Sequence, residues 1–457
     1  MKQVKLNIVI LAAGKGTRMF SSKPKVLHEV AGRPILRHVI DCSKALKPAK
    51  IIVVYGFGGD LAKNTFSGEN IIWVEQTQQL GTGHAVQQAA PHLDDDANTL
   101  ILLGDVPLVD AQSCAKLLAK ANNQLAIQSF NKADPTGYGR IIRGANQNVT
   151  AITEHKDATE AERTIKEVNT GIMAMPAKAL KHWLAGLTNN NAQGEYYLTD
   201  IVGFAVRDKV NVVAEITGDE WSVTGINSKQ DLAQIERVYQ LRNAEALLKK
   251  GVTLADPARI DVRGTLQTAQ DVEIDVGCVF EGNVTLGENV KIGAYCVIKD
   301  ATIGANTIIN PFSHIVEANI GENNRIGPFA RLRPGTELQS DVHIGNFVEL
   351  KNAQVDSDTS INHLSYVGDS TVGKRVNIGA GTITCNYDGA NKHKTVIEDD
   401  VFVGSDTQLI APVTIGKGAT IGAGSTISKH APAGELTISR AKQMTITGWK
   451  RPVKHQK

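Results

Sequence analysis

The stretch TLGENVKIGAYCVIKDATIGANTIINPFSHIVEANIGENNRIG, residues 285–327, repeats an aliphatic residue at every fifth or sixth position. This period runs unbroken from Leu286 to Ile378 and returns from Val403 to Ile427. Twelve of its 22 aliphatic positions are followed directly by Gly, which serves where a chain turns sharply or where backbones approach closely. Such a repeat predicts a parallel β-helix, in which three hexads form one coil of a triangular prism around an aliphatic axis.

Residues 5 to about 225 follow another pattern, because short apolar runs alternate with helical ones. Strands are expected at 8–12, 51–55, 100–103 and 125–130, and helices at 34–46, 83–92 and 111–121. This alternation predicts an α/β domain with a largely parallel sheet.

The two regions are joined by a predicted helix. Ser228, with Asp231 three residues later, is typical of a helix start, and Gly251 ends the helical pattern. We therefore expect an α/β domain at 1–228, a helical linker at 229–251 and a β-helix domain at 252–457. The tail after Pro432 is expected to be irregular.

Composition narrows the class of protein. The formal charge of +2 favours no nucleic-acid partner, and no stretch reaches the roughly 20 apolar residues of a membrane-spanning helix. The five Cys form no C-x-x-C pair, so neither a disulfide framework nor a structural zinc site is indicated. A β-helix zinc site with several His ligands is also disfavoured, because His314 and His343 fall on different faces. We expect a soluble cytoplasmic protein.

The loop LAAGKGTRM, residues 11–19, follows the first expected strand. Gly14 and Gly16 let backbone N–H groups surround an anion, and strand-to-helix loops are where open α/β sheets bind phosphates. The loop fits neither the dinucleotide fingerprint nor the P-loop, and an ordinary turn is the alternative. Arg18 and Lys25 follow it, and two cations favour a polyphosphate substrate.

Asp105 ends another expected strand, in the segment GDVPL. A carboxylate at the carboxyl end of a parallel strand reaches the same crevice as the glycine loop, where phosphates need Mg²⁺. We predict that Asp105 is a metal ligand. The alternative is an Asp that only starts a turn before Pro107.

In the repeat, Arg333 and Lys351 each follow an aliphatic position, three hexads apart. They should stack in adjacent coils, where like charges repel unless an anion such as phosphate lies between them or the side chains splay into water. Counting hexads places His363 on the preceding face of the coil of Lys351, and Tyr366 just before the corner. Since neutral His takes up a proton near pH 6.5, His363 is our candidate general base.

The same count places Ala380 above His363, and Asn377 near the corner of Tyr366. Between Ile378 and Val403 the repeat breaks for a loop that carries Asn386 and Tyr387. A polar excursion from a regular prism is where substrate contacts are expected.

The combined motifs resemble a known family. The segments LAAGKGTRM, KPKVLH, EQTQQLGTGHA, GDVPL, GYGR, EVNTG and GEYYLTD resemble sugar-1-phosphate nucleotidyltransferases. With the hexapeptide repeat and ITCNYDGANKHKT, the chain closely resembles the bacterial bifunctional N-acetylglucosamine-1-phosphate uridyltransferases / glucosamine-1-phosphate N-acetyltransferases. The resemblance covers nearly the whole chain, and it implies a Rossmann-like nucleotidyltransferase domain followed by a left-handed β-helix.

The resemblance implies roles for individual residues. The nucleotide would be held by Leu11, Ala12, Ala13, Gly14, Lys25, Gln76, Gly81, Thr82, Leu103, Gly104 and Asp105. The sugar would be held by Gly139, Glu154 and Asn169, Mg²⁺ by Asp105 and Asn227, and the transferred phosphate would be stabilised by Arg18 and Lys25. Leu103 departs from the family, in which Tyr is common at this position.

In the prism the resemblance implies that Arg333, Lys351, Tyr366 and Asn377 hold glucosamine-1-phosphate and that His363 is the base. Acetyl-CoA would contact Ala380, Asn386, Tyr387, Ser405, Ala423 and Arg440. Arg440 to Lys457 carries six Lys or Arg and no acidic residue, so it is either a solvated tail or a cap for coenzyme A phosphates.

The implied function is the synthesis of UDP-N-acetylglucosamine, a precursor of bacterial envelope polymers, by a homotrimer. Glucosamine-1-phosphate would be acetylated by acetyl-CoA, and N-acetylglucosamine-1-phosphate would then react with UTP. Two alternatives remain: a single-activity nucleotidyltransferase whose prism serves regulation or assembly, and a purely structural protein.

Overall fold

The computed structural model describes residues 5–454, and the chain divides into two compact units between Tyr239 and Gln240. Lys457 of the basic tail lies outside the described residues.

The first unit is built on one sheet with the strand order β11–β7–β10–β6–β1–β4–β5. These strands are β1 (Lys5–Ala12), β4 (Lys50–Tyr55), β5 (Ile72–Glu75), β6 (Ala97–Leu103), β7 (Leu125–Asn131), β10 (Glu167–Pro176) and β11 (Val212–Ile216). β1 pairs in parallel with β4 and β6, whereas β10 runs antiparallel between β6 and β7. β8 (Arg140–Arg143) and β9 (Val149–Thr153) extend β10 as an antiparallel pair. The predicted, largely parallel sheet is confirmed.

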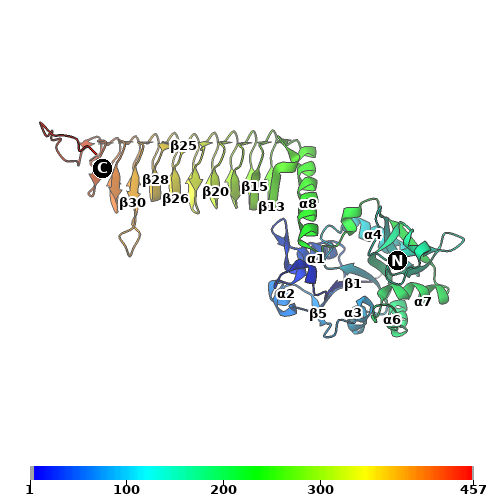
Figure 1. Cartoon of the computed structure of the whole chain (residues 1–457). Helices are drawn as coiled ribbons and strands as arrows, with labels where there is room; N and C mark the ends of the chain where they lie inside the picture. The colour runs from blue at the N-terminus through cyan, green and yellow to red at the C-terminus, as the bar shows by residue number, and fades with distance from the viewer. Residues whose placement is uncertain (1–4, 455–457) are drawn as a thin grey trace. The chain divides into compact units, whose positions relative to one another are not determined.

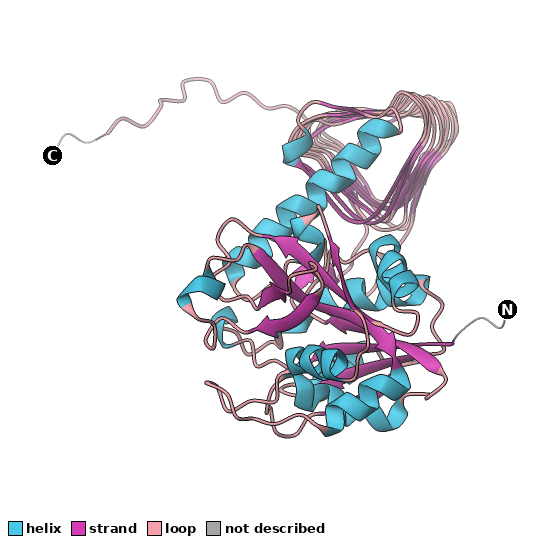
Figure 2. Cartoon of the chain, turned by 90° about the vertical axis from the view of Figure 1, so that its right-hand side faces the viewer, coloured by secondary structure: helices cyan, strands magenta, loops and turns pink. Residues whose placement is uncertain are grey.

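Helices cover both faces of this sheet (Figure 2). They are α1 (Ile35–Ala45), α2 (Gly59–Thr65), α3 (Thr82–Ala89), α4 (Ala111–Lys120), α5 (Glu160–Arg163), α6 (Ala177–Ala185) and α7 (Ile201–Arg207). Successive residues of β1 point to opposite faces: Ile8 and Ile10 join the core under α1 and α4, and Val9 joins the core under α3, α6 and α7. The three predicted helices are confirmed as α1, α3 and α4.

Helix α8 (Lys229–Lys249) begins with the predicted cap. Asp231 N donates to Ser228 Oγ at 3.1 Å, and Ser228 N donates to the Asp231 carboxylate at 2.8 Å. The boundary between the two units lies inside this helix, because Ile235 belongs to an apolar cluster of the first unit and Leu247 to the core of the second.

The second unit is a prism with a triangular cross-section (Figure 2). Its first face contains β12 (Thr253–Leu254), β14 (Glu273–Ile274), β16 (Lys291–Ile292), β19 (Ile308–Ile309), β22 (Arg325–Ile326), β25 (His343–Asn346), β27 (Ser360–His363), β29 (Asn377–Ile378), β32 (Phe402–Val403), β35 (Thr420–Ile421) and β37 (Leu436–Thr437). The second face contains β17 (Val297–Lys299), β20 (His314–Val316), β23 (Arg331–Leu332), β30 (Ile383–Cys385), β33 (Gln408–Ile410) and β36 (Thr426–Ile427). The third contains β18 (Thr302–Ile303), β21 (Ala318–Ile320), β24 (Thr336–Leu338), β31 (Thr395–Ile397) and β34 (Val413–Ile415). Four longer strands bend from the second face onto the third: β13 (Ile260–Thr268), β15 (Cys278–Leu286), β26 (Glu349–Val355) and β28 (Tyr366–Val372).

Equivalent aliphatic residues pair from coil to coil along the axis. Ile274 pairs with Ile292 and Ile292 with Ile309, so one coil takes 18 or 17 residues. All three side chains are buried. The parallel β-helix predicted from the repeat is confirmed.

The glycines that follow the axis residues, apart from Gly327 with a φ of 84°, allow close approach of backbones rather than sharp turns. A Cβ on Gly404 would lie 2.5 Å from Ala423 N in the next coil, where no side chain fits. The corners are instead formed mainly by non-glycine residues with positive φ, such as Asn306 (58°), Phe312 (62°) and Asp341 (62°). Along one corner the rings of Tyr295, Phe312, Phe329 and Phe347 stack, with centroids 5.0–5.5 Å apart.

The prism is longer than the repeat suggested. It begins at β12, before Leu286, and β37 still pairs with β35, so the prediction of an irregular tail after Pro432 was wrong for Leu436 and Thr437. The predicted break in the repeat is confirmed as a loop, residues 386–394, that leaves between β30 and β31 (Figure 1). Pairing resumes where Thr395 meets Ser370.

Among the described residues, no helix is long and apolar enough to span a membrane. That part of the chain also lacks any cluster of three or more His, Cys, Asp or Glu side chains able to hold a metal ion.

Candidate active sites

A pocket of about 540 Å³ opens at the carboxyl ends of β1 and β6. The loops after the two strands are joined, because Gly104 N donates to Leu11 O at 2.8 Å. The predicted residues that line this pocket are Leu11, Ala12, Ala13, Gly14, Lys25, Gln76, Gly81, Thr82, Leu103 and Asp105. Residues up to 94 positions apart in the chain, Leu11 and Asp105, therefore meet in one pocket.

The segment from Gln76 to Thr82 closes one side of the pocket. Gln76 is buried, and its Nε2 donates to Gly81 O at 3.0 Å. Gly81 has a φ of 110° and a Cβ there would lie 2.6 Å from Tyr196 O, so the position requires glycine. Thr82 Oγ1 accepts from Leu198 N at 3.1 Å, which ties α3 to the GEYYLTD segment.

A lysine and an aspartate that line the pocket meet an asparagine beside it, and together they supply the groups expected for phosphate and metal chemistry. Lys25 Nζ lies 2.5 Å from Asp105 Oδ2 and 3.2 Å from Asn227 Oδ1. Asn227 is brought there because Ile226 N donates to Asp105 O at 2.9 Å. A carboxylate and an amide oxygen are hard ligands of the kind Mg²⁺ takes, and both already face a cation here, so the donor set fits the metal.

Arg18 is exposed and is not among the residues that line the pocket, whereas Lys15 is. Its role at the transferred phosphate stays a prediction. Leu103, where the family often has Tyr, contributes a side chain to the pocket wall. A Cβ on Gly171 would lie 3.0 Å from Leu103 Cδ1, so the leucine packs closely on that glycine.

The three predicted sugar-binding residues come together beside this pocket. Asn169 N donates to Gly139 O at 2.9 Å, and a Cβ on Gly139 would lie 3.4 Å from Glu154 Oε1. Burial raises the pKa of Glu154 above its ordinary value, and a 3.0 Å hydrogen bond from Thr199 Oγ1 only partly opposes this. Thr199 was missed by the sequence analysis, although it lies within the quoted GEYYLTD motif.

In the prism, the predicted register of the cation pair is confirmed. Leu332 pairs with Leu350, and Arg333 N donates to Leu350 O at 2.9 Å. Each of these cations also has an acidic partner, however. Arg333 pairs with Glu349 at 2.9 Å, and Lys351 lies 3.9 Å from Asp369.

The loop 386–394 brings a third cation that the sequence analysis missed. Lys392 lies beside Lys351, and the neighbouring ammonium lowers the pKa of Lys392. Asn386 holds the base of the loop, because its Nδ2 donates to Asp369 Oδ2 at 2.5 Å and approaches the Tyr366 hydroxyl at 3.4 Å. The sequence signal that could have identified Lys392 was the group of basic residues in the loop that interrupts the repeat.

His363 ends β27 on the first face and is exposed to solvent. Its Nδ1 lies 3.0 Å from Asn346 Oδ1. Because an amide oxygen can only accept, this contact places the proton of a neutral imidazole on Nδ1 and leaves Nε2 as the acceptor nitrogen. A hollow of about 360 Å³, lined by Phe329, Phe347 and Asn346 among others, lies next to the imidazole.

His363 follows Lys351 within the turn that runs from Leu350 to its partner Val367, as predicted. Two other details of the predicted register were wrong. Tyr366 pairs with Glu349 and therefore lies on the cationic face, not before it. Asn377 pairs with Ser360, three residues before the corner at which His363 lies. Counting hexads missed the corner residues that separate one face from the next.

The predicted position of Ala380 is confirmed, since Gly381 N donates to His363 O at 3.2 Å. The pairing of Ile378, Val403 and Ile421 continues this column through Ser405 and Ala423. Arg440 Nη1 donates to Ala423 O at 2.6 Å. Tyr387 is 61 % exposed on the loop, and its hydroxyl donates to Gly389 O. Of the expected acetyl-CoA residues, Ala380, Ser405 and Ala423 thus form a column that ends at a cation, whereas Asn386 and Tyr387 lie on the loop.

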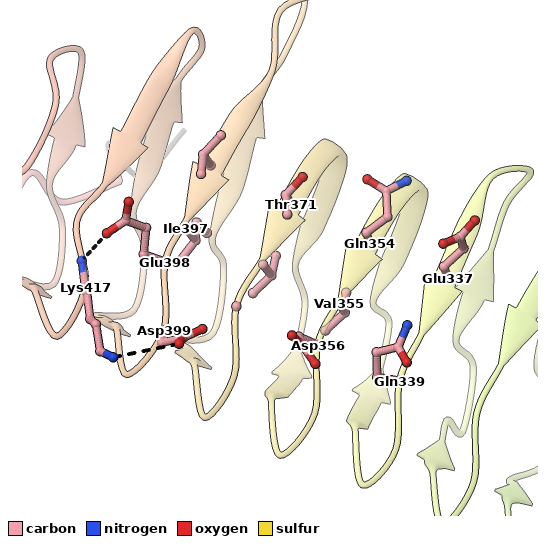
Figure 3. A pocket seen from close by; sticks show the side chains of 13 residues that line it. Glu337, Gln339, Gln354, Val355, Asp356, Thr371, Ile397, Glu398, Asp399 and Lys417 are labelled. Atoms are coloured by element: carbon pink, nitrogen blue, oxygen red, sulfur yellow. Dashed lines mark hydrogen bonds and ion pairs between the residues drawn. The ribbon is translucent and has the colours of Figure 1, made fainter.

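A larger hollow of about 670 Å³ lies on the third face (Figure 3). Glu337, Asp356, Glu398 and Asp399 make it acidic, and Lys417 N donates to Glu398 at 2.7 Å. It contains none of the predicted site residues.

Comparisons with known proteins match the two units of the chain to different families. Residues 8–170 match the MobA-like NTP transferase domain family. Residues 262–343 match the GMPPB C-terminal domain, and residues 394–429 match the bacterial transferase hexapeptide repeat.

Whole-chain relatives carry both parts. The chain is 64 % identical to the "Bifunctional protein GlmU" of Methylobacillus flagellatus over 99 % of this chain and 98 % of that protein. It is 59 % identical to the protein of the same name from Janthinobacterium sp. (strain Marseille), over 99 % and 100 % of the two chains.

An NTP transferase domain joined to a hexapeptide prism, the combination that whole-chain relatives named as bifunctional also match, defines a bifunctional transferase. The chain belongs to the GlmU family of bifunctional proteins. This excludes the single-activity and the purely structural alternatives.

Proposed function

We propose that the prism transfers the acetyl group of acetyl-CoA to glucosamine-1-phosphate, and that the α/β unit transfers a uridylyl group from UTP to N-acetylglucosamine-1-phosphate. The final product would be UDP-N-acetylglucosamine. The observation that carries the proposal is the presence of two separate sites, one with a carboxylate and cations at a phosphate-binding loop and one with a histidine beside a cationic face.

In the prism, Arg333, Lys351 and Lys392 bind the phosphate of the sugar, and Tyr366 lies on the same face as Arg333 and Lys351. Nε2 of His363 takes a proton from the substrate ammonium, and the free amine attacks the thioester carbon. The C–N bond forms, the C–S bond breaks, and coenzyme A leaves as the thiolate, which takes up a proton. The column through Ala380, Ser405 and Ala423 is the proposed cofactor path.

In the α/β unit, Glu154 and the backbone around Gly139 and Asn169 hold the sugar, while the glycine loop holds the triphosphate. A sugar phosphate oxygen attacks the α-phosphorus of UTP, and pyrophosphate leaves. Lys25 stabilises the charge that develops, and Mg²⁺ held by Asp105 and Asn227 would supply further charge neutralisation.

We also propose that the chain acts in the cytoplasm as a homotrimer of 49.0 kDa subunits. The half-exposed aromatic row at one corner of the prism, from Tyr295 to Phe347, offers an apolar strip for contact between copies. Sedimentation equilibrium would measure the subunit number.

One experiment tests both assignments. The protein is incubated with acetyl-CoA, glucosamine-1-phosphate, UTP and Mg²⁺, and thiol and pyrophosphate release are recorded. Asp105→Ala should abolish pyrophosphate release but leave thiol release intact, and His363→Ala should suppress thiol release but leave uridylyl transfer to added N-acetylglucosamine-1-phosphate intact. Loss of both activities in either variant would contradict the assignment of the two sites.

A further inference from the structure

Lys25 lies where a divalent cation would have to bind. Its ammonium donates to Asp105 Oδ2 at 2.5 Å and to Asn227 Oδ1 at 3.2 Å, and these are the two oxygens of the proposed metal site. One positive group thus already bridges both protein ligands. A metal ion and this ammonium cannot occupy the space between the two oxygens together.

The lysine is held in this position by the glycine loop. Gly16 has a φ of 60°, and a Cβ there would lie 2.8 Å from Lys25 Cβ, so the loop backbone packs directly on the lysine stem. The Lys25 side chain is only 10 % exposed and that of Asp105 only 20 %. The ion pair is therefore poorly screened, unlike the exposed pair of Lys23 and Glu29 nearby.

Without a bound nucleotide, the site offers a metal ion few ligands in exchange for displacing the Lys25 ammonium. Asp105 and Asn227 supply two protein oxygens, whereas Mg²⁺ takes six ligands and usually completes its shell with water and substrate phosphates. A metal entering alone would also leave the Lys25 ammonium without its acceptors in a nearly buried position. A bound triphosphate removes both costs, since its oxygens can accept from the ammonium and add ligands to the metal.

We propose that Lys25 is an internal counter-cation that closes the metal site until a nucleotide is bound, so that metal and nucleotide bind together. This rests on the proposed function of the α/β unit. Lys25 has two successive partners: the metal ligands in the free protein and the nucleotide phosphates in the complex. It opposes metal binding in the first state and favours it in the second.

The test measures the binding of Mn²⁺, followed by the loss of its free-ion paramagnetic resonance signal, with and without UTP. Lys25→Met keeps the stem that packs on Gly16 and removes the charge. Without UTP, this variant should bind Mn²⁺ about tenfold to a hundredfold more tightly than the wild type, which is the range for a lost hydrogen bond to a charged group. With UTP, the order should be reversed, because the wild type keeps its phosphate contact.

Lys23→Met is the matched control, since it removes a charge two residues away that pairs with Glu29, and it should bind Mn²⁺ as the wild type does. Lys25→Leu, which also keeps an apolar stem and removes the charge, is measured beside Lys25→Met and carries the test if the latter does not fold. Equal Mn²⁺ affinity of wild type and both Lys25 variants without UTP would overturn the inference. If no variant binds Mn²⁺ even with UTP, the metal assignment itself is overturned.

Discussion

The contact between His363 and Asn346 allows the catalytic base to be separated from the residue that orients it. Without His363, the amine has no positioned group to take its proton, and general bases contribute about 10²- to 10⁴-fold. Without Asn346, the imidazole keeps its position on β27 but loses one 3.0 Å hydrogen bond. Such a bond is worth about 0.5–1.5 kcal/mol, which corresponds to about 2- to 13-fold in rate.

We therefore expect His363→Ala to lower the turnover number of acetyl transfer about 10²- to 10⁴-fold, and Asn346→Ala to lower it about tenfold or less. Thiol release from acetyl-CoA at saturating glucosamine-1-phosphate measures both. Uridylyl transfer by the same samples serves as the control for folding. If the two variants lost turnover equally, Asn346 would take part directly in the chemistry. If His363→Ala lost only affinity, another base would have to be sought.

The remaining predictions concern each unit in turn. A fragment of residues 1–251, which keeps the half of α8 that packs on the first unit, should release pyrophosphate from UTP and should not acetylate; acetylation by it would contradict the division. Glu154→Gln should raise the melting temperature of that fragment above pH 4.5 but not below it. Burial raises the pKa of this carboxyl, so the stability of the wild-type fragment falls as the pH rises from 4.5 through the raised pKa. A gain independent of pH would refute burial as the cause. Gly404→Ala should destabilise the prism by about 1–3 kcal/mol in thermal unfolding, since its Cβ meets backbone. Gly203→Ala in α7 of the first unit, where a Cβ meets open space, should not destabilise that unit. Lys392→Ala should raise the KM for glucosamine-1-phosphate about tenfold with little change in turnover; an unchanged KM would place the phosphate elsewhere.

The period of the repeat predicted the prism and the residues along its axis, but it did not predict the positions of residues near the corners of the prism. Aliphatic spacing identified the prism and the pairing of Leu332 with Leu350, because the axis tolerates only apolar side chains. The same spacing misplaced Tyr366 and Asn377, because the residues between two faces are not marked by hydrophobicity. The positive-φ corners are formed by residues as different as Asn306 and Phe312.

Besides the corner positions, the sequence could not predict which side chains contact one another. The residues of the nucleotide pocket were predicted from motifs, but the bridge from Lys25 to Asp105 and Asn227 joins residues 80 and 202 positions apart. Counting hexads could have placed Asn346 next to His363, since Asn346 follows Ile344 by two positions as His363 follows Ile361. Its partnership with His363 becomes visible only when a polar neighbour is sought in the preceding coil.

The coil-by-coil pairing of the prism has an evolutionary consequence. Between β14 and β22 each coil of 17 or 18 residues hydrogen-bonds only to the coils before and after it, and aliphatic residues pair with aliphatic residues along the axis. Loss or duplication of one whole coil between β14 and β22 would leave every remaining strand with a partner of the same kind. Neither the residues around Asp105 nor those around His363 would change their neighbours. The length of the prism can therefore vary in whole-coil steps without loss of either chemistry, which makes it a part of the gene where in-frame deletions of 17 or 18 codons should be tolerated.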